Sequence, residues 1–237
     1  MIKGFIEKIM EMKDNLRRDN LLPHEKTIRS GNIQTVITEQ YRLLRSRLSS
    51  LNGSHGNKVI AVTSTQKGEG KSITSVNLAI VMAEDTKKKV LLIDGDMRKP
   101  SIHAFFNCKS EYGLVDLLTN KIDIESILVP SGVNNLTILP AGGPVESPSD
   151  IIANPRFKEG IERLKKRFDY IIMDSPPIIP FADMNILGDI VDGILLVVKA
   201  ETTPKERVVD ALKSLNKENI IGVVLNDSKK RLTKIYY

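Results

Sequence analysis

Residues 58–72, KVIAVTSTQKGEGKS, decide the fold of this 237-residue chain. An apolar run of strand character, residues 58–64, leads into a Gly-rich loop, residues 65–70, and Lys71-Ser72 then open a helical pattern. In a strand, loop and helix of this kind, glycines let backbone N–H groups turn inward around phosphate oxygens, and the helix N-terminus adds its positive end. The stretch therefore predicts a phosphate-binding P-loop. The alternative is a Gly-rich turn that carries Gly-Lys-Ser by chance.

Two residues of this loop have predicted roles of their own. Lys71 is expected to bridge the outer phosphates of a nucleotide, and Ser72 is expected to hold Mg²⁺. The first loop position is Thr65, where the common pattern has glycine. This is a tolerated departure from the pattern.

Carboxylates follow two further apolar runs. Asp94 ends residues 90–94 (VLLID), Asp96 comes two residues later, and Asp174 ends residues 170–174 (YIIMD). Because ligands of open α/β sheets bind at the carboxyl ends of the strands, these acids suit Mg²⁺ and a general base beside the phosphate loop. The first pair alone could be a solvated acidic turn. Three motifs in this order on successive predicted strands indicate one nucleotide site.

The rest of the core repeats the alternation of strand and helix. Most apolar runs do not alternate with polar residues, as expected for strands covered on both faces of a parallel sheet. The sequence therefore predicts an α/β fold, a doubly wound and mostly parallel sheet of the P-loop NTPase type, with N-terminal helices and a short C-terminal tail. The predicted strands are residues 58–64, 90–94, 136–140, 170–174, 193–199 and 220–226, the predicted helices are residues 71–84, 154–168 and 204–219, and residues 142–149 are predicted to form a loop.

Three regions follow from these patterns: an N-terminal amphipathic segment (1–30), the nucleotide-binding domain (31–227) and a basic tail with tyrosines (228–237). Residues 36–51 predict an amphipathic helix at the start of the domain. Membrane-surface helices need a strongly basic polar face, and residues 1–30 carry seven basic and five acidic groups. That segment is therefore expected to pack against the domain or contact a partner.

The net charge of +6 invites a nucleic-acid or membrane partner, but it belongs to the two ends of the chain. Residues 1–52 carry 10 basic and 6 acidic side chains, residues 228–237 carry 4 and 0, and residues 53–227 carry 21 and 23. Opposite charges on two parts of one chain favour self-association. The sequence has no apolar run near the ~20 residues of a membrane span and no signal peptide. With a single cysteine, Cys108, and no zinc-like spacing of histidines, a soluble, cytoplasmic chain is expected.

The motifs together resemble those of the bacterial protein tyrosine kinases of capsular and exopolysaccharide biosynthesis. The resemblance rests on residues 65–72, on Asp94-Gly95-Asp96-Met97-Arg98 and on Asp174-Ser175-Pro176-Pro177, and it is collinear from about residue 35 to residue 226. These are cytoplasmic autokinases, related in fold to the MinD/ParA ATPases, that work with transmembrane polysaccharide co-polymerase partners. The resemblance implies ATP- and Mg²⁺-dependent phosphoryl transfer to tyrosine hydroxyls, mostly on a neighbouring subunit's tail.

The resemblance also implies a role for each matched residue. Asp94 is the candidate base that takes the proton of the incoming tyrosine, with Lys71 and Asp96 as further catalytic residues. Asn226, at the end of the last strand, is expected to read the purine ring, and its alternative role is that of a strand-end cap. Mg²⁺ is expected on Ser72, Asp96 and Asp174. The expected ATP-binding residues are Lys67, Gly68, Glu69, Gly70, Lys71, Ser72, Ile73 and Asn226.

Two further features of the resemblance concern assembly and the phosphoacceptor. Glu39, Arg42 and Arg45 match an ExxRxxR helix that builds ring-shaped homo-oligomers; the alternative is an ion pair between Glu39 and Arg42 within one helix. Tyr236 and Tyr237 are the expected phosphoacceptors, although the family's tails usually hold more tyrosines; the alternative is a packed C-terminus. The other tyrosines are predicted to lie inside structural elements: Tyr41, Tyr112 and Tyr170.

The expected partners are other copies of the chain, a transmembrane co-polymerase-type activator that recruits the chain to the inner face of the membrane, protein tyrosine substrates and a cognate phosphatase. No nucleic-acid partner is expected. One rival hypothesis is a MinD/ParA-like positioning ATPase, which typically has a lysine five residues before Lys71, where this chain has Gln66. A second rival is a catalytically weak, nucleotide-dependent scaffold.

Overall fold

A computed structural model of the chain describes residues 34–51, 58–109, 111–119, 122–143 and 145–228. The predictions made for residues 1–30 and for the tail tyrosines Tyr236 and Tyr237 lie outside these ranges. None of the described helices is long and apolar enough to cross a membrane.

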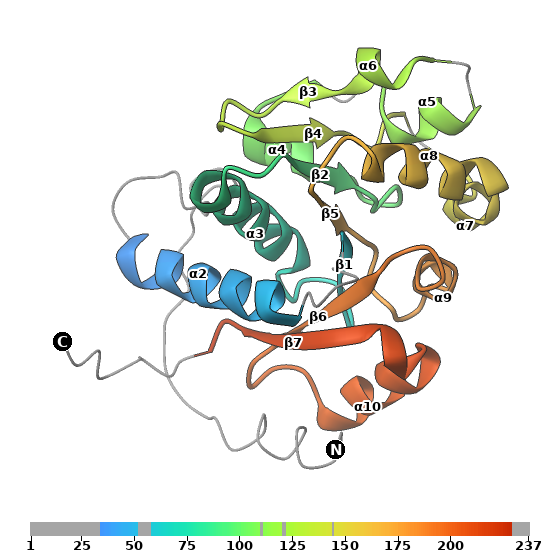
Figure 1. Cartoon of the computed structure of the whole chain (residues 1–237). Helices are drawn as coiled ribbons and strands as arrows, with labels where there is room; N and C mark the ends of the chain where they lie inside the picture. Colours follow the sequence, from blue (N-terminus) through green and yellow to red (C-terminus); the bar gives the residue numbers. More distant parts are fainter. Residues whose placement is uncertain (1–33, 52–57, 110, 120–121, 144, 229–237) are drawn as a thin grey trace.

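A seven-stranded sheet organises the described residues (Figure 1). Its order is β3-β4-β2-β5-β1-β6-β7; β3 is antiparallel to β4, and all other neighbours are parallel. The prediction of a doubly wound, mostly parallel sheet is confirmed. The strands are β1 (Val59–Ser64), β2 (Val90–Asp94), β3 (Val129–Pro130), β4 (Leu136–Leu139), β5 (Tyr170–Asp174), β6 (Gly193–Lys199) and β7 (Ile220–Asn226).

Helices cover both faces of the sheet, which is why its central strands are apolar throughout. On one face, α2 (Gln34–Leu51), α3 (Lys71–Thr86) and α4 (Ile102–Phe106) bury side chains against the sheet. The other face has its own apolar cluster. The helices that contribute to this second cluster are α5 (Leu114–Thr119), α6 (Ile124–Ile127), α7 (Pro148–Ala153), α8 (Pro155–Lys165), α9 (Asp183–Leu187) and α10 (Lys205–Ser214).

Several predicted boundaries need correction. The helix predicted over residues 154–168 is α8, which begins after Asn154 because the Asn154 side chain accepts a hydrogen bond from the Arg156 N–H and caps the helix. The helix predicted over residues 204–219 ends at Ser214, and a separate 3₁₀ turn follows at Lys217–Asn219. The predicted loop at residues 142–149 is wrong at its end, where Pro148 starts α7, a position that tolerates proline.

The prediction for Tyr112 is also wrong. Tyr112 lies in a bend before α5 and is 60% exposed. The backbone after it is fixed, because the Leu114 N–H donates to the Pro140 carbonyl at 2.8 Å. Since Pro140 follows the carboxyl end of β4, this bend lies at the same edge of the sheet as Asp94.

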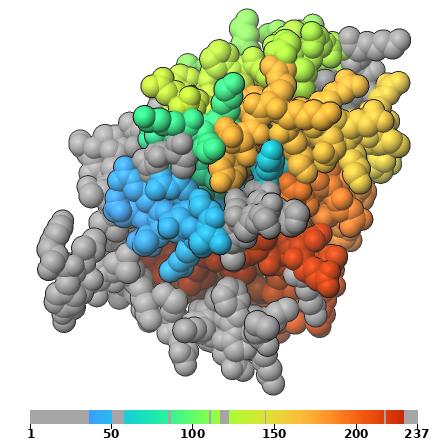
Figure 2. Space-filling model, viewed as in Figure 1, coloured from blue at the N-terminus to red at the C-terminus, as the bar shows by residue number. Residues whose placement is uncertain are grey.

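Helix α2 lies at the surface of the domain (Figure 2). It packs on α3 through Leu48, whose side chain is buried, while Ile37 and Leu43 are 44% and 51% exposed. The helix thus presents apolar side chains to solvent as well as to the core.

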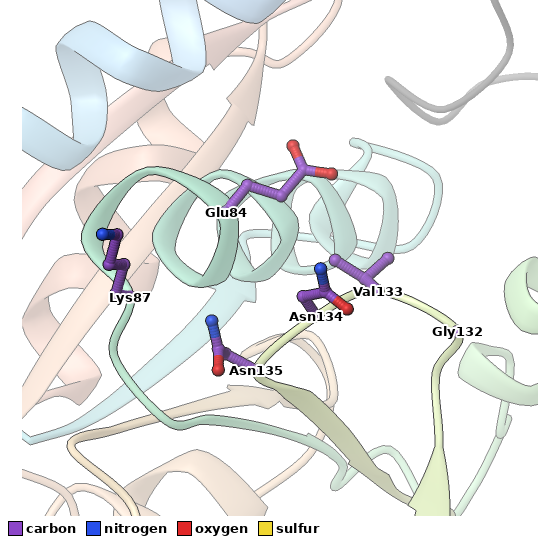
Figure 3. Close-up of a pocket in the computed structure, with 6 residues that line it drawn as sticks. All are labelled: Glu84, Lys87, Gly132, Val133, Asn134 and Asn135. Carbon is purple, nitrogen blue, oxygen red and sulfur yellow. The ribbon is translucent and has the colours of Figure 1, made fainter.

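A cavity of about 630 Å³ lies at the opposite end of α3 from the P-loop (Figure 3). It opens between the last turn of α3 and the turn that precedes β4. None of the predicted site residues lines it, so it is not the predicted nucleotide site. Its lining residues are Glu84, Lys87, Gly132, Val133, Asn134 and Asn135.

Candidate active site

The P-loop connects β1 to α3 and has the backbone that its glycines predict. Gly68 and Gly70 have φ values of 87° and 93°, in the left-handed region that favours glycine. A Cβ at Gly70 would lie 1.9 Å from the Asn226 amide nitrogen, so a larger residue there would displace the Asn226 side chain. α3 then begins at Lys71, and its N-terminus opens toward the loop.

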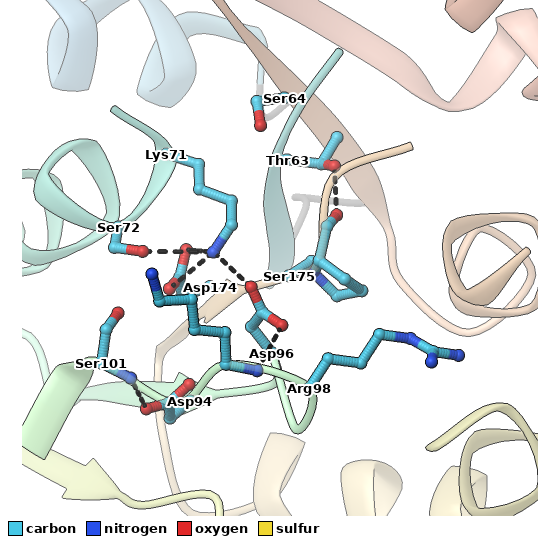
Figure 4. Close-up of polar contacts among 12 residues, drawn as sticks. Thr63, Ser64, Lys71, Ser72, Asp94, Asp96, Arg98, Ser101, Asp174 and Ser175 are labelled. Atoms are coloured by element: carbon cyan, nitrogen blue, oxygen red, sulfur yellow. Dashed lines mark hydrogen bonds and ion pairs between the residues drawn. The ribbon is translucent and has the colours of Figure 1, made fainter. Parts of the chain in front are cut away.

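Lys71 lies at the centre of a polar cluster (Figure 4). Its Nζ lies 2.8 Å from Asp96 Oδ2, 3.3 Å from Asp174 Oδ2 and 3.2 Å from Ser72 Oγ. Burial alone would lower the pKa of Lys71, but the Asp174 and Asp96 carboxylates raise it above its ordinary value. The cluster therefore holds a cation among two carboxylates and a hydroxyl.

The same three oxygen-bearing residues are those predicted to hold Mg²⁺. The described part of the chain contains no group of three His, Cys, Asp or Glu side chains able to bind a metal. Mg²⁺ in nucleotide sites usually takes one or two carboxylates, with phosphates and waters completing its shell. Asp96, Asp174 and Ser72 fit this donor set, and Lys71 Nζ marks a point that a cation can occupy among them.

Asp94 is the third acid of the site, and its surroundings differ from those of the other two. It is fully buried and lies directly across from Asp174 in the β2–β5 register. Asp94 Oδ2 accepts hydrogen bonds from the Ser101 and Ile102 N–H groups at 2.8 and 2.9 Å, while its Oδ1 is buried with no hydrogen-bond partner. Burial, and next the Asp174 charge, raise the pKa of Asp94 to about 7. A carboxyl poised near neutral pH with a free oxygen can serve as a general base.

The predicted ATP-binding residues of the loop differ in what they expose. Lys67 and Gly68 are exposed, and Ile73 is half-buried. Glu69 is buried: its Oε2 accepts from the Gln66 N–H at 3.1 Å, and its Oε1 accepts from the Thr203 hydroxyl. Because its carboxylate is engaged in this way, Glu69 can offer a phosphate only its backbone.

Asn226 lies against the P-loop. Its amide nitrogen donates to the Glu69 carbonyl at 2.9 Å, and Glu69 in turn contacts the loop between β6 and α10 through Thr203. Asn226 thus joins the end of β7 to the phosphate loop. The contact fits the strand-end role and leaves the purine-reading role as a prediction.

No role was predicted from the sequence for Arg98, Asp183 or Ser149, which lie around the Asp96 turn. Arg98 bonds to Asp183, which is fully buried, and Ser149 donates to the same carboxylate at 2.5 Å. Arg98 is the last residue of the motif Asp94-Gly95-Asp96-Met97-Arg98, which was the available signal. Asp183 and Ser149 lie 85 and 51 residues from it along the chain.

In α2, Arg42 Nη1 lies 2.6 Å from Glu39 Oε1, and both side chains are nearly half exposed. This is the ion pair within one helix that was the alternative to oligomerisation. Arg45 is half-buried on the same helix. An exposed ion pair of this kind stabilises a helix by only about 0.3–0.5 kcal/mol. This small gain does not explain why Glu39, Arg42 and Arg45 recur at a spacing of three residues.

Comparison with known proteins first defines the class. A family model described as an AAA domain matches residues 57–226, which include the P-loop, the three acids and Asn226. The chain is therefore a P-loop nucleotide-binding protein of the AAA-domain class.

Similar proteins define the family more closely. The chain is 35% identical over 198 residues to the tyrosine-protein kinase YwqD of Bacillus subtilis, covering 83% of each chain. It is 34% identical to the tyrosine-protein kinase CpsD of Streptococcus agalactiae, covering 72% of this chain and 74% of that one. The chain belongs to the family of bacterial tyrosine-protein kinases. Some relatives are longer, and this chain matches only a part of them. The tyrosine-protein kinase wzc of Salmonella typhi is 32% identical, and the match covers 86% of this chain and 28% of the length of that protein.

Solved structures agree with this assignment. The BceF tyrosine kinase domain superimposes with a TM-score of 0.75 at 30% identity, covering 84% of this chain and 80% of that one. The kinase domain of the Escherichia coli tyrosine kinase ETK gives 0.81 at 25% identity, covering 97% and 89%. The cell division ATPase MinD of Pyrococcus furiosus gives 0.60 at 24% identity, covering 74% and 76%, and shares the fold.

Proposed function

We propose that the chain transfers the γ-phosphoryl group of ATP, with Mg²⁺, to tyrosine hydroxyls of proteins, including its own tail, and thereby regulates the synthesis or export of an exopolysaccharide or capsule. The observation that carries this proposal is the meeting of Lys71, Asp96 and Asp174 beside Asp94 at the carboxyl edge of the sheet. Family membership supports the choice of tyrosine as acceptor. In this chemistry positioning and charge do most of the work.

Each residue of the site has a proposed part in the reaction. ATP supplies the phosphoryl group, and Mg²⁺ neutralises charge on its oxygens. The P-loop N–H groups and Lys71 hold the phosphates, while Ser72, Asp96 and Asp174 hold the metal. Asp94 Oδ1 takes the proton of the incoming tyrosine hydroxyl. The tyrosine oxygen then forms its bond to the γ-phosphorus while the bond between that phosphorus and the ADP oxygen breaks. A tyrosine hydroxyl has a pKa near ~10, so a positioned base is needed at neutral pH.

A direct test separates this proposal from a nucleotide-dependent switch or scaffold. The purified chain is incubated with Mg-ATP, alone and with the cytoplasmic tail of a candidate activator, and is then probed for phosphotyrosine. A phosphotyrosine signal is expected in at least one condition. ATP hydrolysis without phosphotyrosine in both conditions would contradict the kinase proposal and favour a switch.

The proposed acceptors are Tyr236 and Tyr237, on a basic tail that can approach the acidic site of a neighbouring chain. Changing both to phenylalanine is expected to lower autophosphorylation by at least about tenfold, because the hydroxyl is the nucleophile. Phosphotyrosine is measured after mixing an active chain that lacks both tail tyrosines with a Lys71→Met substrate chain, which either keeps Tyr236 and Tyr237 or has both changed to phenylalanine. Tyr112→Phe, which removes the hydroxyl of a tyrosine that is 60% exposed, is the matched control. An undiminished phosphotyrosine signal in the substrate without tail tyrosines would show that another tyrosine is the acceptor.

Self-association through α2 is also proposed. Glu39 and Arg42 would leave their intrahelical pair, Arg42 and Arg45 would meet carboxylates of the next copy in a ring, and the exposed Ile37 and Leu43 would add apolar contact. The chain is proposed to be cytoplasmic and to be recruited to the inner face of the membrane by a transmembrane co-polymerase-type activator. A phosphatase would reverse the modification. Nucleic acid has no part in this proposal.

Charge reversal tests the role of α2. Changing Arg42 and Arg45 together to glutamate is expected to shift assemblies toward monomer by at least about tenfold in the association constant, because like charges then face each other across the interface. Sedimentation velocity measures the shift. Lys213→Glu, which breaks the similar pair with Asp210 on α10, should leave the profile unchanged. An unaltered profile in the α2 variant would show that Glu39 and Arg42 serve the helix alone.

A further inference from the structure

Arg98 joins the turn that carries Asp96 to the first residue of α9, Asp183. It lies in the turn after β2, where the Lys99 N–H donates to Asp96 O at 3.0 Å and to Asp96 Oδ1 at 3.1 Å. Arg98 Nε and Nη2 donate to the two oxygens of Asp183 at 2.7 and 3.1 Å. Asp183 begins α9, which follows the loop that starts after Asp174. This two-point contact therefore links the Asp96 turn to the segment beyond Asp174.

The anchor of this link is a buried carboxylate. The Asp183 side chain is 0% exposed, and that of Arg98 is 29% exposed. Ser149, in the first turn of α7, also donates to Asp183, and the Arg98 guanidinium lies 4.2 Å from the centre of the Phe181 ring. Burial alone would raise the pKa of Asp183, but the hydrogen bonds from Arg98 and Ser149 hold it below its ordinary value. An ionised, buried and fully bonded carboxylate is a fixed point for the loop.

The turn sends its two functional side chains in different directions. Asp96 Oδ2 faces Lys71 Nζ at 2.8 Å, whereas Arg98 points away from the Lys71 cluster (Figure 4). The Arg98 side chain is therefore not part of the Lys71 cluster. Arg98 can affect the cluster through the backbone that it shares with Asp96 and through the attraction between its charge and the Asp96 carboxylate.

We propose that Arg98 is a positioning residue: by tying the Asp96 turn to Asp183, it holds Asp96 at the distance from Asp174 that a shared Mg²⁺ requires. This inference rests on the proposed Mg-nucleotide chemistry of the site. Residues that hold metal ligands in place typically change metal affinity by about 10- to 100-fold when they are altered. Arg98 should therefore affect the Mg²⁺-dependent part of nucleotide binding and spare the part that the P-loop backbone provides.

The test compares ADP affinity in EDTA with ADP affinity in saturating Mg²⁺, by titration calorimetry. The gain in affinity on adding Mg²⁺ is expected to fall about tenfold in Arg98→Ala and in Asp183→Asn, with the affinity in EDTA changed by less than about twofold. Arg98→Lys should lie between these and the unaltered chain, because one ammonium cannot make the two-point contact. Urea unfolding of the same preparations confirms that each variant is folded.

The controls separate this role from general loosening of the fold. Arg167→Ala breaks another two-point arginine–carboxylate pair, with Glu125 at the surface, and should leave the gain from Mg²⁺ unaltered. Equal losses of ADP affinity in EDTA and in Mg²⁺ would mean that Arg98 only supports the fold. A folded variant in which Mg²⁺ raises ADP affinity as much as in the unaltered chain would overturn the proposal. If Arg98→Ala does not fold, Arg98→Lys and Asp183→Asn decide. If the unaltered chain does not bind ADP at all, the proposed function fails instead.

Discussion

Changing Lys71 to methionine is expected to lower the rate of phosphotyrosine formation by about 10³-fold or more. Methionine keeps about the length of the apolar stem of lysine but lacks the ammonium group that should hold the outer phosphates. It also removes the cation that lies 2.8 Å from Asp96 and 3.3 Å from Asp174. Two buried carboxylates then keep their hydrogen bonds from Lys99 and Ser75 but lose their cation, and removing one partner of a buried ion pair costs about 3–5 kcal/mol of unfolding free energy in comparable cases.

This double role gives the Lys71 prediction two readouts. Quantitative phosphotyrosine detection gives the rate, and thermal unfolding with and without Mg²⁺ gives the stability. Mg²⁺ should stabilise Lys71→Met more than the unaltered chain, because the metal restores positive charge between Asp96 and Asp174. Lys165→Met is the matched control. Lys165, at the end of α8, also lies between two acids, Glu162 of the same helix and Asp192 just before β6. Phosphotyrosine at the unaltered rate in Lys71→Met would remove the P-loop from the mechanism.

The parts of the fold that the sequence predicted correctly are those decided by local pattern. The continuous apolar runs that form β2, β5 and β6 have the predicted bounds. Strands that are buried on both faces are apolar along their whole length, so the ends of the run mark the ends of the strand. Parallel order then brings Asp94 beside Asp174, so two motifs that are 80 residues apart meet in one register. The short elements were missed: β3 has two residues and α6 has four, too few for a period to show.

The site shows the same division between local and long-range information. The P-loop and its glycines could be predicted, because their backbone conformation is written in the residues themselves. The partners of the side chains could not. Glu69 is predicted to bind ATP, and its backbone can still do so, but the hydrogen bond of its carboxylate to Thr203, 134 residues away, could not be foreseen. Asp183 resembles any helix-starting aspartate until the fold brings Arg98 to it. Such pairings depend on packing between segments that are distant in the sequence. The residues around either partner therefore do not indicate the pairing.

Changing Asp94 to asparagine is expected to have opposite effects on activity and stability. Phosphotyrosine formation should fall by about 10²–10⁴-fold, because an amide cannot accept the tyrosine proton. Affinity for Mg-ADP should be retained, since Asp94 is not among the residues assigned to the phosphates or the metal. The nucleotide-free protein should become more stable above pH 7. There the buried Asp94 must be charged, which its pKa of about 7, against an ordinary 3.8, shows to be unfavourable.

The sign and size of the stability effect follow from that pKa. A carboxyl whose folded pKa is raised favours the fold while it is protonated, and this favour is lost as the pH rises through the folded value. At about 1.4 kcal/mol per pKa unit, the ionised Asp94 costs up to about 4 kcal/mol at pH 8, and asparagine avoids this cost. The gain of Asp94→Asn in urea unfolding should therefore be largest above pH 7 and vanish toward pH 4.

A matched control decides whether the gain belongs to the site. Asp116→Asn alters another buried carboxylate, which accepts a hydrogen bond from the Gly113 N–H, and it should bring no stability above pH 7 and no loss of transfer. An Asp94→Asn variant less stable than the unaltered chain at pH 8 would show that the carboxylate serves the fold. The expected opposite result means that the fold tolerates an unfavourable charge at Asp94. The reason would be that phosphoryl transfer needs a base there, one whose pKa lies near neutral pH because it is buried beside Asp174.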